Sequence, residues 1–343
     1  MARACEPSRL GKKHISVAAH LSASNRNDAR PSYAAAAVQP RTRSFRHAGH
    51  RLVYDEYPPS RGAGASERAV ILVPGLLFSR TMHGPLASTL ASEGHRVLCL
   101  DLLGHGASDR PPEMWNYSMP LFARQVLALM DHLELERAVV GGTSLGANTA
   151  LEVVAADPDR VQGMLIEMPV LDNALLGCAI GFTPLMISLT FGAPLTRALS
   201  RAMALVPRRG PLLGRMLLDW ASQDPKPSAS VLQGLFFGRT APPRTERSTF
   251  TAPTLIIGHS RDPIHPFSDS DMLAHELPHA RLIEASSILE LRLSPERLTG
   301  EIVRFIQGCF EPATPKRPAA RPRGSGPGRT ARNGAVRGAP HRA

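Results

Sequence analysis

The stretch AVVGGTSLG, residues 138–146, decides the fold of this chain of 343 residues. Residues 138–142 form a short run of small and β-branched apolar residues, which predicts a buried strand. From Leu145 onward the apolar residues follow helical spacing, and the pattern ends near Asp157-Pro158. Gly142-Thr-Ser-Leu-Gly146, a G-x-S-x-G motif, therefore lies at a turn from a strand into a helix.

Ser144, at the centre of this turn, is the candidate nucleophile. A sharp strand-to-helix turn strains the serine backbone and exposes its Oγ above the sheet edge, and the two glycines leave room for the turn. The helix that begins at Leu145 directs free N–H groups and the positive end of its dipole to the same place, where an oxyanion would be stabilised. The alternative is a Gly/Ser turn without chemistry, but the strand-and-helix context favours the nucleophile.

Strands and helices alternate on both sides of this motif. The predicted strands are residues 48–57, 69–73, 95–100, 138–142, 163–168, 254–258 and 281–284, and the predicted helices are 82–93, 117–135, 145–157, 268–277 and 295–308. Such alternation is typical of an α/β protein with a mostly parallel, doubly wound sheet. The predicted core comprises residues 48–170 and 251–311.

Residues 171–250 interrupt the alternation and predict a helical cap, or lid. Asn173 to Thr196 contains no charged residue, but Gly and Pro interrupt it, so we expect an apolar lid and no stable membrane span. The cap residues favour a small apolar acyl substrate or ligand, although many of them would simply pack the cap onto the core. Five arginines give the cap a basic side, namely Arg197, Arg201, Arg208, Arg209 and Arg215. We interpret that side as a solvated face.

The order of elements and four loops resemble the α/β-hydrolase superfamily, especially its small-molecule esterases and lipases, over about residues 45–311. Val73-Pro-Gly-Leu76 is similar to the family loop that gives the second oxyanion N–H, which implies an oxyanion hole formed by Leu76 and Leu145. Asp101-Leu-Leu-Gly-His-Gly-Ala-Ser108 resembles a structural loop of the family. A serine nucleophile, instead of an aspartate, disfavours dehalogenase and epoxide-hydrolase chemistry.

The same resemblance implies a catalytic acid and a catalytic base. Asp262, after the strand at 254–258, corresponds to the carboxylate of the family's triad, with Glu167 and Asp172 as fallback candidates. The histidine expected after the last strand is missing, because counting back from Pro295-Glu296 puts Ser287-Ile288 in its place. A serine without a base is a poor nucleophile at neutral pH.

Two readings of the missing histidine remain open. Another histidine could serve as the base, and His265, which shares a loop with Asp262, is a better candidate than His259 or His83. Alternatively, the protein is catalytically weak or inactive and binds a small apolar ligand or a protein partner. In some plant hormone receptors of this fold an aliphatic residue replaces the histidine, as Ile288 would here.

The net charge of +11 comes from the ends of the chain. Residues 1–47 carry a net +7 and residues 312–343 a net +8, so the middle is mildly acidic at −4. These ends predict disordered basic extensions and do not favour nucleic-acid binding. Four widely separated cysteines form no zinc or disulfide pattern, and we expect a reduced, cytoplasmic setting without metal or cofactor. The oligomeric state is left open.

Overall fold

The computed structural model describes residues 37–60, 68–262 and 264–311. The disordered extensions predicted at 1–47 and 312–343 therefore fall largely outside the described residues. Eight strands form one sheet in the order β1-β2-β4-β3-β5-β6-β7-β8. They are β1 (Arg41–His47), β2 (His50–Tyr57), β3 (Ala69–Val73), β4 (Arg96–Asp101), β5 (Ala138–Thr143), β6 (Val161–Glu167), β7 (Thr254–His259) and β8 (Ala280–Ala285).

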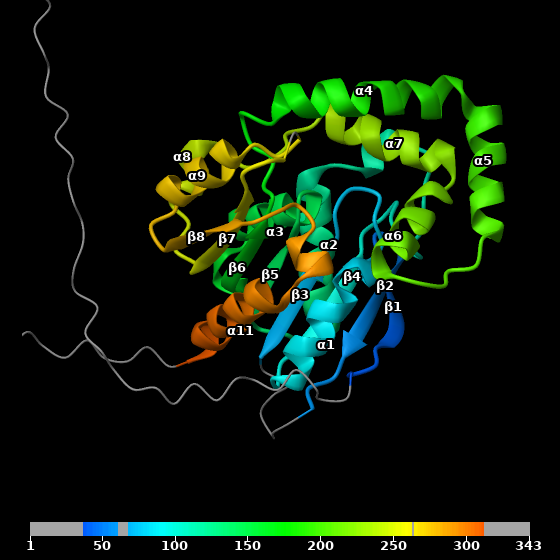
Figure 1. The fold of residues 1–343 in the computed structure, drawn as a ribbon. Coiled ribbons are helices and arrows are strands. Elements are labelled where there is room, and N and C mark those ends of the chain that lie inside the picture. Colours follow the sequence, from blue (N-terminus) through cyan, green and yellow to red (C-terminus); the bar gives the residue numbers. More distant parts are fainter. Residues whose placement is uncertain (1–36, 61–67, 263, 312–343) are drawn as a thin grey trace, which may run out of the picture.

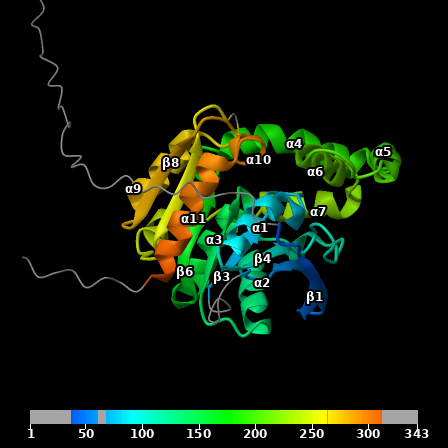
Figure 2. The ribbon, with the colours of Figure 1, turned by 60° about the horizontal axis from the view of Figure 1, so that its bottom comes forward.

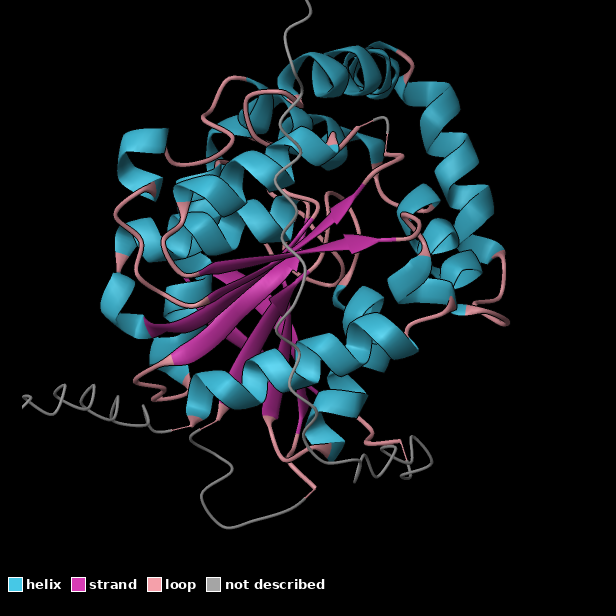
Figure 3. Cartoon of the chain, turned by 60° about the vertical axis from the view of Figure 1, so that its left-hand side comes forward, coloured by secondary structure: helices cyan, strands magenta, loops and turns pink. Residues whose placement is uncertain are grey.

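The sheet is parallel from β4 to β8 and antiparallel only at its β1–β2–β4 edge. The central strands are apolar on both faces because helices cover both sides. Figures 1 and 3 show the two helical layers. One apolar cluster joins the sheet to α1 (Gly84–Ser92) and α11 (Glu296–Phe310), and the other joins it to α2 (Met119–His132), α3 (Leu145–Ala156) and α9 (Phe267–Glu276). The predicted fold class is confirmed.

Residues 41–47 correct one predicted boundary. Their composition predicts that they belong to the disordered extension, but they form β1, paired with β2 from Arg41↔Glu56 to His47↔His50. Ala48 and Gly49 make the hairpin turn with φ values of 48° and 85°, as a two-residue turn of the I′ type requires. Only Phe45 of this edge strand is buried, so its exposed, arginine-rich sequence looks like part of a tail.

Residues 171–250, which we call the cap segment, lie between β6 and β7. They contain α4 (Leu175–Phe191), α5 (Ala193–Leu205), α6 (Leu212–Ala221), α7 (Pro225–Phe236) and the short α8 (Arg244–Arg247). Helices α4 and α7 pack against each other, and α5 lies at the outer edge of the molecule (Figures 1 and 2). Asp269 of α9 anchors the start of the segment, because its carboxylate accepts backbone N–H groups from Leu171, Asn173 and Ala174 at 2.7–3.1 Å.

The described residues contain no single helix that is long and apolar enough to cross a membrane. Helix α4 and residues Pro194–Leu205 pass that test only as a pair, and they are bent by 98°.

Candidate active site

Ser144 occupies a strained turn between β5 and α3. Its φ and ψ angles are 54° and −110°, which a residue with a side chain rarely adopts. Its N–H donates to the carbonyl of Glu167 at 2.8 Å. A Cβ atom at either Gly142 or Gly146 would lie 2.0 Å from the carbonyl oxygen of Val73, so the close approach of β3 requires both glycines. The turn is thus held from two neighbouring strands.

His265 is hydrogen-bonded to this serine. Its Nε2 lies 2.9 Å from Ser144 Oγ, and its Nδ1 lies 2.8 Å from Asp262 Oδ2. Both His265 and Asp262 come from the loop between β7 and α9, and their side chains are largely buried. The other oxygen of Asp262 accepts the backbone N–H groups of Ile264 and His265 at 2.8 and 3.0 Å. The loop therefore holds acid and imidazole in one fixed geometry.

The electrostatics of the loop set the tautomer of His265. Burial alone would raise the pKa of Asp262, but its hydrogen bonds with His265 and with Ile264, and the charge of the imidazole, outweigh burial and lower the pKa. An ionised carboxylate only accepts hydrogen bonds, so Nδ1 must carry a proton. The lone pair of Nε2 then faces the hydroxyl of Ser144, which is the arrangement of a general base.

The other candidate histidines are engaged elsewhere. His83 lies 3.1 Å from the carbonyl of Val73, and His259 Nδ1 lies 2.9 Å from the carbonyl of Ser287. Burial, more than any other effect, lowers the pKa of His83 to about 4. Ile288, at the position where the family histidine was expected, is 40% exposed.

The fallback carboxylates do not contact His265 by any hydrogen bond found in the described part of the chain. Glu167 accepts hydrogen bonds from Thr143 Oγ1 and from Arg292 Nη2, the second at 2.8 Å. Burial would raise the pKa of Glu167, but the charge of Arg292 and these hydrogen bonds lower it instead. Asp172 is exposed at the start of the cap segment.

Leu76 and Leu145, predicted to form the oxyanion hole, line the same cavity as Ser144. Leu145 is the first residue of α3, whose N–H has no partner within the helix. The loop that carries Leu76 is tied to the cap segment, because Gln223 Nε2 donates to the carbonyl of Leu77. Arg110 Nη1 in turn donates to Gln223 Oε1 at 2.8 Å and fixes the orientation of the amide.

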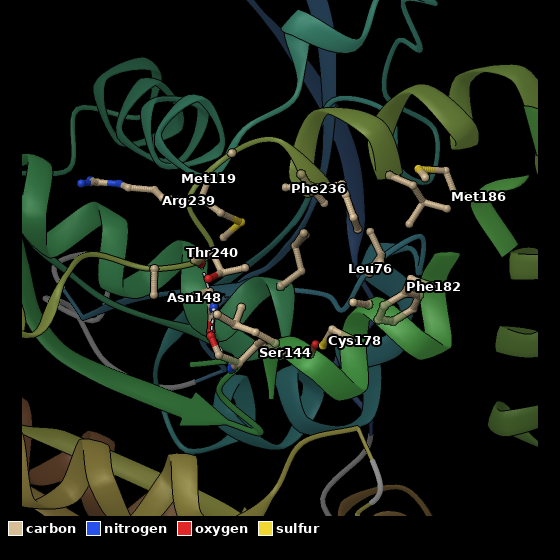
Figure 4. Close-up of a pocket in the computed structure, with 18 residues that line it drawn as sticks. Leu76, Met119, Ser144, Asn148, Cys178, Phe182, Met186, Phe236, Arg239 and Thr240 are labelled. Carbon is tan, nitrogen blue, oxygen red and sulfur yellow. Dashed lines mark hydrogen bonds between the residues drawn. The ribbon is translucent and has the colours of Figure 1, made fainter. Parts of the chain in front are cut away.

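The cavity in front of Ser144 encloses about 500 Å³. Its walls are mostly apolar and come from core and cap alike, as Figure 4 shows. Helix α4 contributes Cys178, Phe182 and Met186, and α7 contributes Leu232 and Phe236. A chamber of this size and lining suits an apolar acyl group or a small apolar molecule. No group of three His, Cys, Asp or Glu side chains in the described ranges could hold a metal ion.

Two features of the site were missed by sequence reasoning. Gln223 holds a loop 146 residues away in the chain, and Arg292 reaches Glu167 across 125 residues. Neither residue belongs to a local motif, so no short-range pattern could have revealed the contact. Gln223 holds the backbone of the loop after Leu76, and Arg292 holds the side chains of Thr143 and Glu167 beside the turn of Ser144.

Comparison with known proteins identifies relatives over most of the core. Zearalenone hydrolase of Bionectria ochroleuca is 33% identical over 103 residues, which cover 29% of this chain and 39% of that protein. The 3-oxoadipate enol-lactonase 2 of Acinetobacter baylyi is 24% identical over 231 residues, 63% of this chain and 82% of the relative. The chain thus spans about two fifths of the first relative's length. The crystal structure of an enol-lactonase from Burkholderia xenovorans superposes with a TM-score of 0.62 at 21% identity, over 77% of this chain and all of the other.

These relatives are hydrolases, and the family described as alpha/beta hydrolase fold matches residues 68–287. Together with the eight-stranded sheet and its strand order, this match shows that the chain belongs to the α/β-hydrolase fold family.

Proposed function

We propose that this protein is a serine hydrolase that cleaves an ester or related acyl bond of a small apolar substrate. The observation that carries the proposal is the chain of two hydrogen bonds from Ser144 Oγ through His265 to Asp262, at 2.9 and 2.8 Å. The proposed base of this protein differs in position from the histidine of the family pattern. His265 lies in the loop after β7, whereas the family histidine follows the last strand.

The proposed reaction uses only groups of the chain and water. Ser144 Oγ attacks the carbonyl carbon while His265 Nε2 takes its proton, and the ionised Asp262 stabilises the resulting imidazolium. The N–H groups of Leu76 and Leu145 hold the oxyanion. When the tetrahedral intermediate collapses, His265 returns the proton to the leaving alkoxide. Water, deprotonated by the same imidazole, then attacks the acyl carbon, and the imidazolium returns that proton to Ser144 Oγ as the acid leaves.

The apolar cavity supports an acyl compound as substrate, and the names of the relatives support ester-like chemistry. Both enol-lactonases and the zearalenone hydrolase are hydrolases by name. The cavity of about 500 Å³ is large enough for a medium acyl chain, so longer p-nitrophenyl esters should be better substrates than acetate.

The test is labelling by a fluorophosphonate probe together with hydrolysis of p-nitrophenyl butyrate. Ser144→Ala should abolish both, and His265→Ala should lower kcat by about 10⁴-fold. His275→Ala is the matched control, since this exposed histidine of α9 lies ten residues further along the chain and should have no effect. A wild type that is folded yet neither labels nor hydrolyses any ester would favour a ligand-binding member of the family.

A further inference from the structure

Helix α4 is apolar on two opposite faces. One face lines the cavity through Cys178, Phe182 and Met186. The other carries Leu176, Ile180, Ile187 and Phe191, four, seven and four residues apart, with 71%, 67%, 50% and 81% of each residue exposed. A helix at the surface of a globular protein normally turns polar side chains toward water. Helix α4 contains no charged residue at all, and its most exposed large side chains are apolar.

Further exposed apolar residues follow in α5, the next helix of the cap segment. Leu195 and Leu199 lie one helical turn apart and are 77% and 58% exposed, and Leu205 follows near the end of the helix. Figures 1 and 2 show that α4 and α5 form the outer border of the cap segment. Isolated exposed leucines are ordinary, but this many exposed large apolar residues on two consecutive helices, which we call the stripe, mark an interaction surface.

The charge around this stripe has one sign. Residues 173–218 contain five arginines and neither Asp nor Glu. Arg208 reaches Asp219 at 3.1 Å, outside that range, whereas Arg197, Arg201, Arg209 and Arg215 have no ion pair with a described carboxylate. Two copies of the chain that met through this surface would bring these cations together. A partner surface that offers both hydrocarbon and negative charge would complement the exposed apolar side chains and the arginines.

We infer that the outer faces of α4 and α5 dock on an anionic lipid bilayer surface. Apolar side chains would enter the boundary between headgroups and acyl chains, and the arginines would lie at the level of anionic headgroups. Helix α4 lies on the bilayer and does not cross it, because its 17 residues are fewer than the about 20 of a typical span and its inner face roofs the cavity of Ser144.

Two apolar residues of the cavity wall reach the surface of the cap segment. Leu175 of α4 and Phe236 of α7 both line the cavity and are about half exposed, and Phe237 packs edge-on against Phe236 with ring centroids 5.4 Å apart. An acyl chain could therefore pass from the bilayer into the cavity along apolar side chains. This consequence, a membrane-borne acyl lipid as substrate, rests on the proposed function, whereas docking itself does not.

The test is sedimentation of the full-length protein with vesicles of equimolar phosphatidylcholine and phosphatidylglycerol, and with vesicles of phosphatidylcholine alone. We expect binding to the anionic vesicles that weakens with added salt. The double variant Ile180→Glu/Phe191→Glu should bind at least about tenfold more weakly, since it places two carboxylates on the stripe. Leu293→Glu is the control and should bind like wild type, because this leucine is also exposed, at 60%, but lies outside the cap segment.

The basic chain ends are present in every variant, so a difference between variants reports the stripe alone. Equal vesicle binding by wild type and double variant would overturn the proposal. So would a wild type that is dimeric in solution and becomes monomeric in the double variant, because a second copy would then cover the stripe. Hydrolysis of soluble p-nitrophenyl butyrate should be unchanged in the double variant, which separates docking from catalysis.

Discussion

Replacement of Asp262 by asparagine tests the catalytic assignment most directly, because the loop geometry dictates what the new amide does. The carboxylate oxygen Oδ1 accepts two backbone N–H groups, from Ile264 and His265, at 2.8 and 3.0 Å. An amide oxygen keeps those bonds, so in Asp262→Asn the NH₂ group must take the place of Oδ2. It then faces Nδ1 of His265, from which Oδ2 lies at 2.8 Å.

That arrangement forces the wrong tautomer on His265. An NH₂ group can only donate, so Nδ1 becomes an acceptor and the proton of the neutral imidazole moves to Nε2. Nε2 then donates to Ser144 Oγ and can no longer take its proton. Loss of the base in this way lowers kcat by about 10⁴-fold, or about 5.5 kcal/mol of transition-state stabilisation, in serine hydrolases with a comparable triad.

The measurement is kcat for p-nitrophenyl butyrate at neutral pH, with the rate of fluorophosphonate labelling as a second readout. Asp172→Asn is the control, because this exposed carboxylate was the fallback acid and should leave both readouts unchanged. Thermal unfolding of the two variants would verify that each is folded. If Asp262→Asn keeps more than a tenth of the wild-type kcat, Asp262 is not the acid and the tautomer argument fails.

Three further predictions concern the parts that hold the site. Gly146→Ala should lower the free energy of unfolding by about 3 kcal/mol, measured in urea, because its Cβ would lie 2.0 Å from a backbone carbonyl of β3; a wild-type value would mean that the turn can relax. Gln223→Ala should lower kcat about fivefold, because the loop that carries Leu76 and Leu77 loses its hydrogen bond to the cap segment. Gln233→Ala is the control, since it removes only a surface hydrogen bond to Thr190, and it should leave kcat unchanged. Equal kcat values for the two variants would contradict the role of Gln223. Burial lowers the pKa of His105 from 6.5 to about 4. As the pH falls, this histidine is therefore protonated first in the unfolded state, and the free energy of unfolding should decrease by on the order of 3 kcal/mol between pH 6.5 and pH 4. Urea unfolding at several pH values should show a shallower decline for His105→Gln, and identical slopes would refute this assignment.

The order of the core elements could be predicted from local patterns. Each central strand is a continuous apolar run, and each helix carries its own spacing, so AVVGG at 138–142 and its neighbours indicate a parallel sheet without knowledge of the tertiary contacts. β1 was the exception. Its residues are mostly exposed and only Phe45 is buried, and an edge strand that buries so little has little local pattern to reveal it.

Some residues of the candidate site could likewise be recognised from local sequence patterns, whereas the contacts between them could not. Ser144 is recognisable because the strained turn needs its two glycines within four residues, and the Asp262 loop is recognisable from its position after a strand. The sequence also shows that the expected histidine is absent near Ile288 and that His265 is a candidate in its place. Their catalytic roles remain predictions.

Only the tertiary structure decides which imidazole meets the serine. Ser144 and His265 are 121 residues apart, and their 2.9 Å contact depends on the relative placement of β5 and the β7–α9 loop across the sheet. The hydrogen bond between Gln223 and the carbonyl of Leu77 depends in the same way on how the cap segment packs. Local sequence indicates most of the backbone conformation, because helical and strand spacing of apolar residues is a local pattern, whereas hydrogen bonds between distant segments depend on the packing of the whole chain.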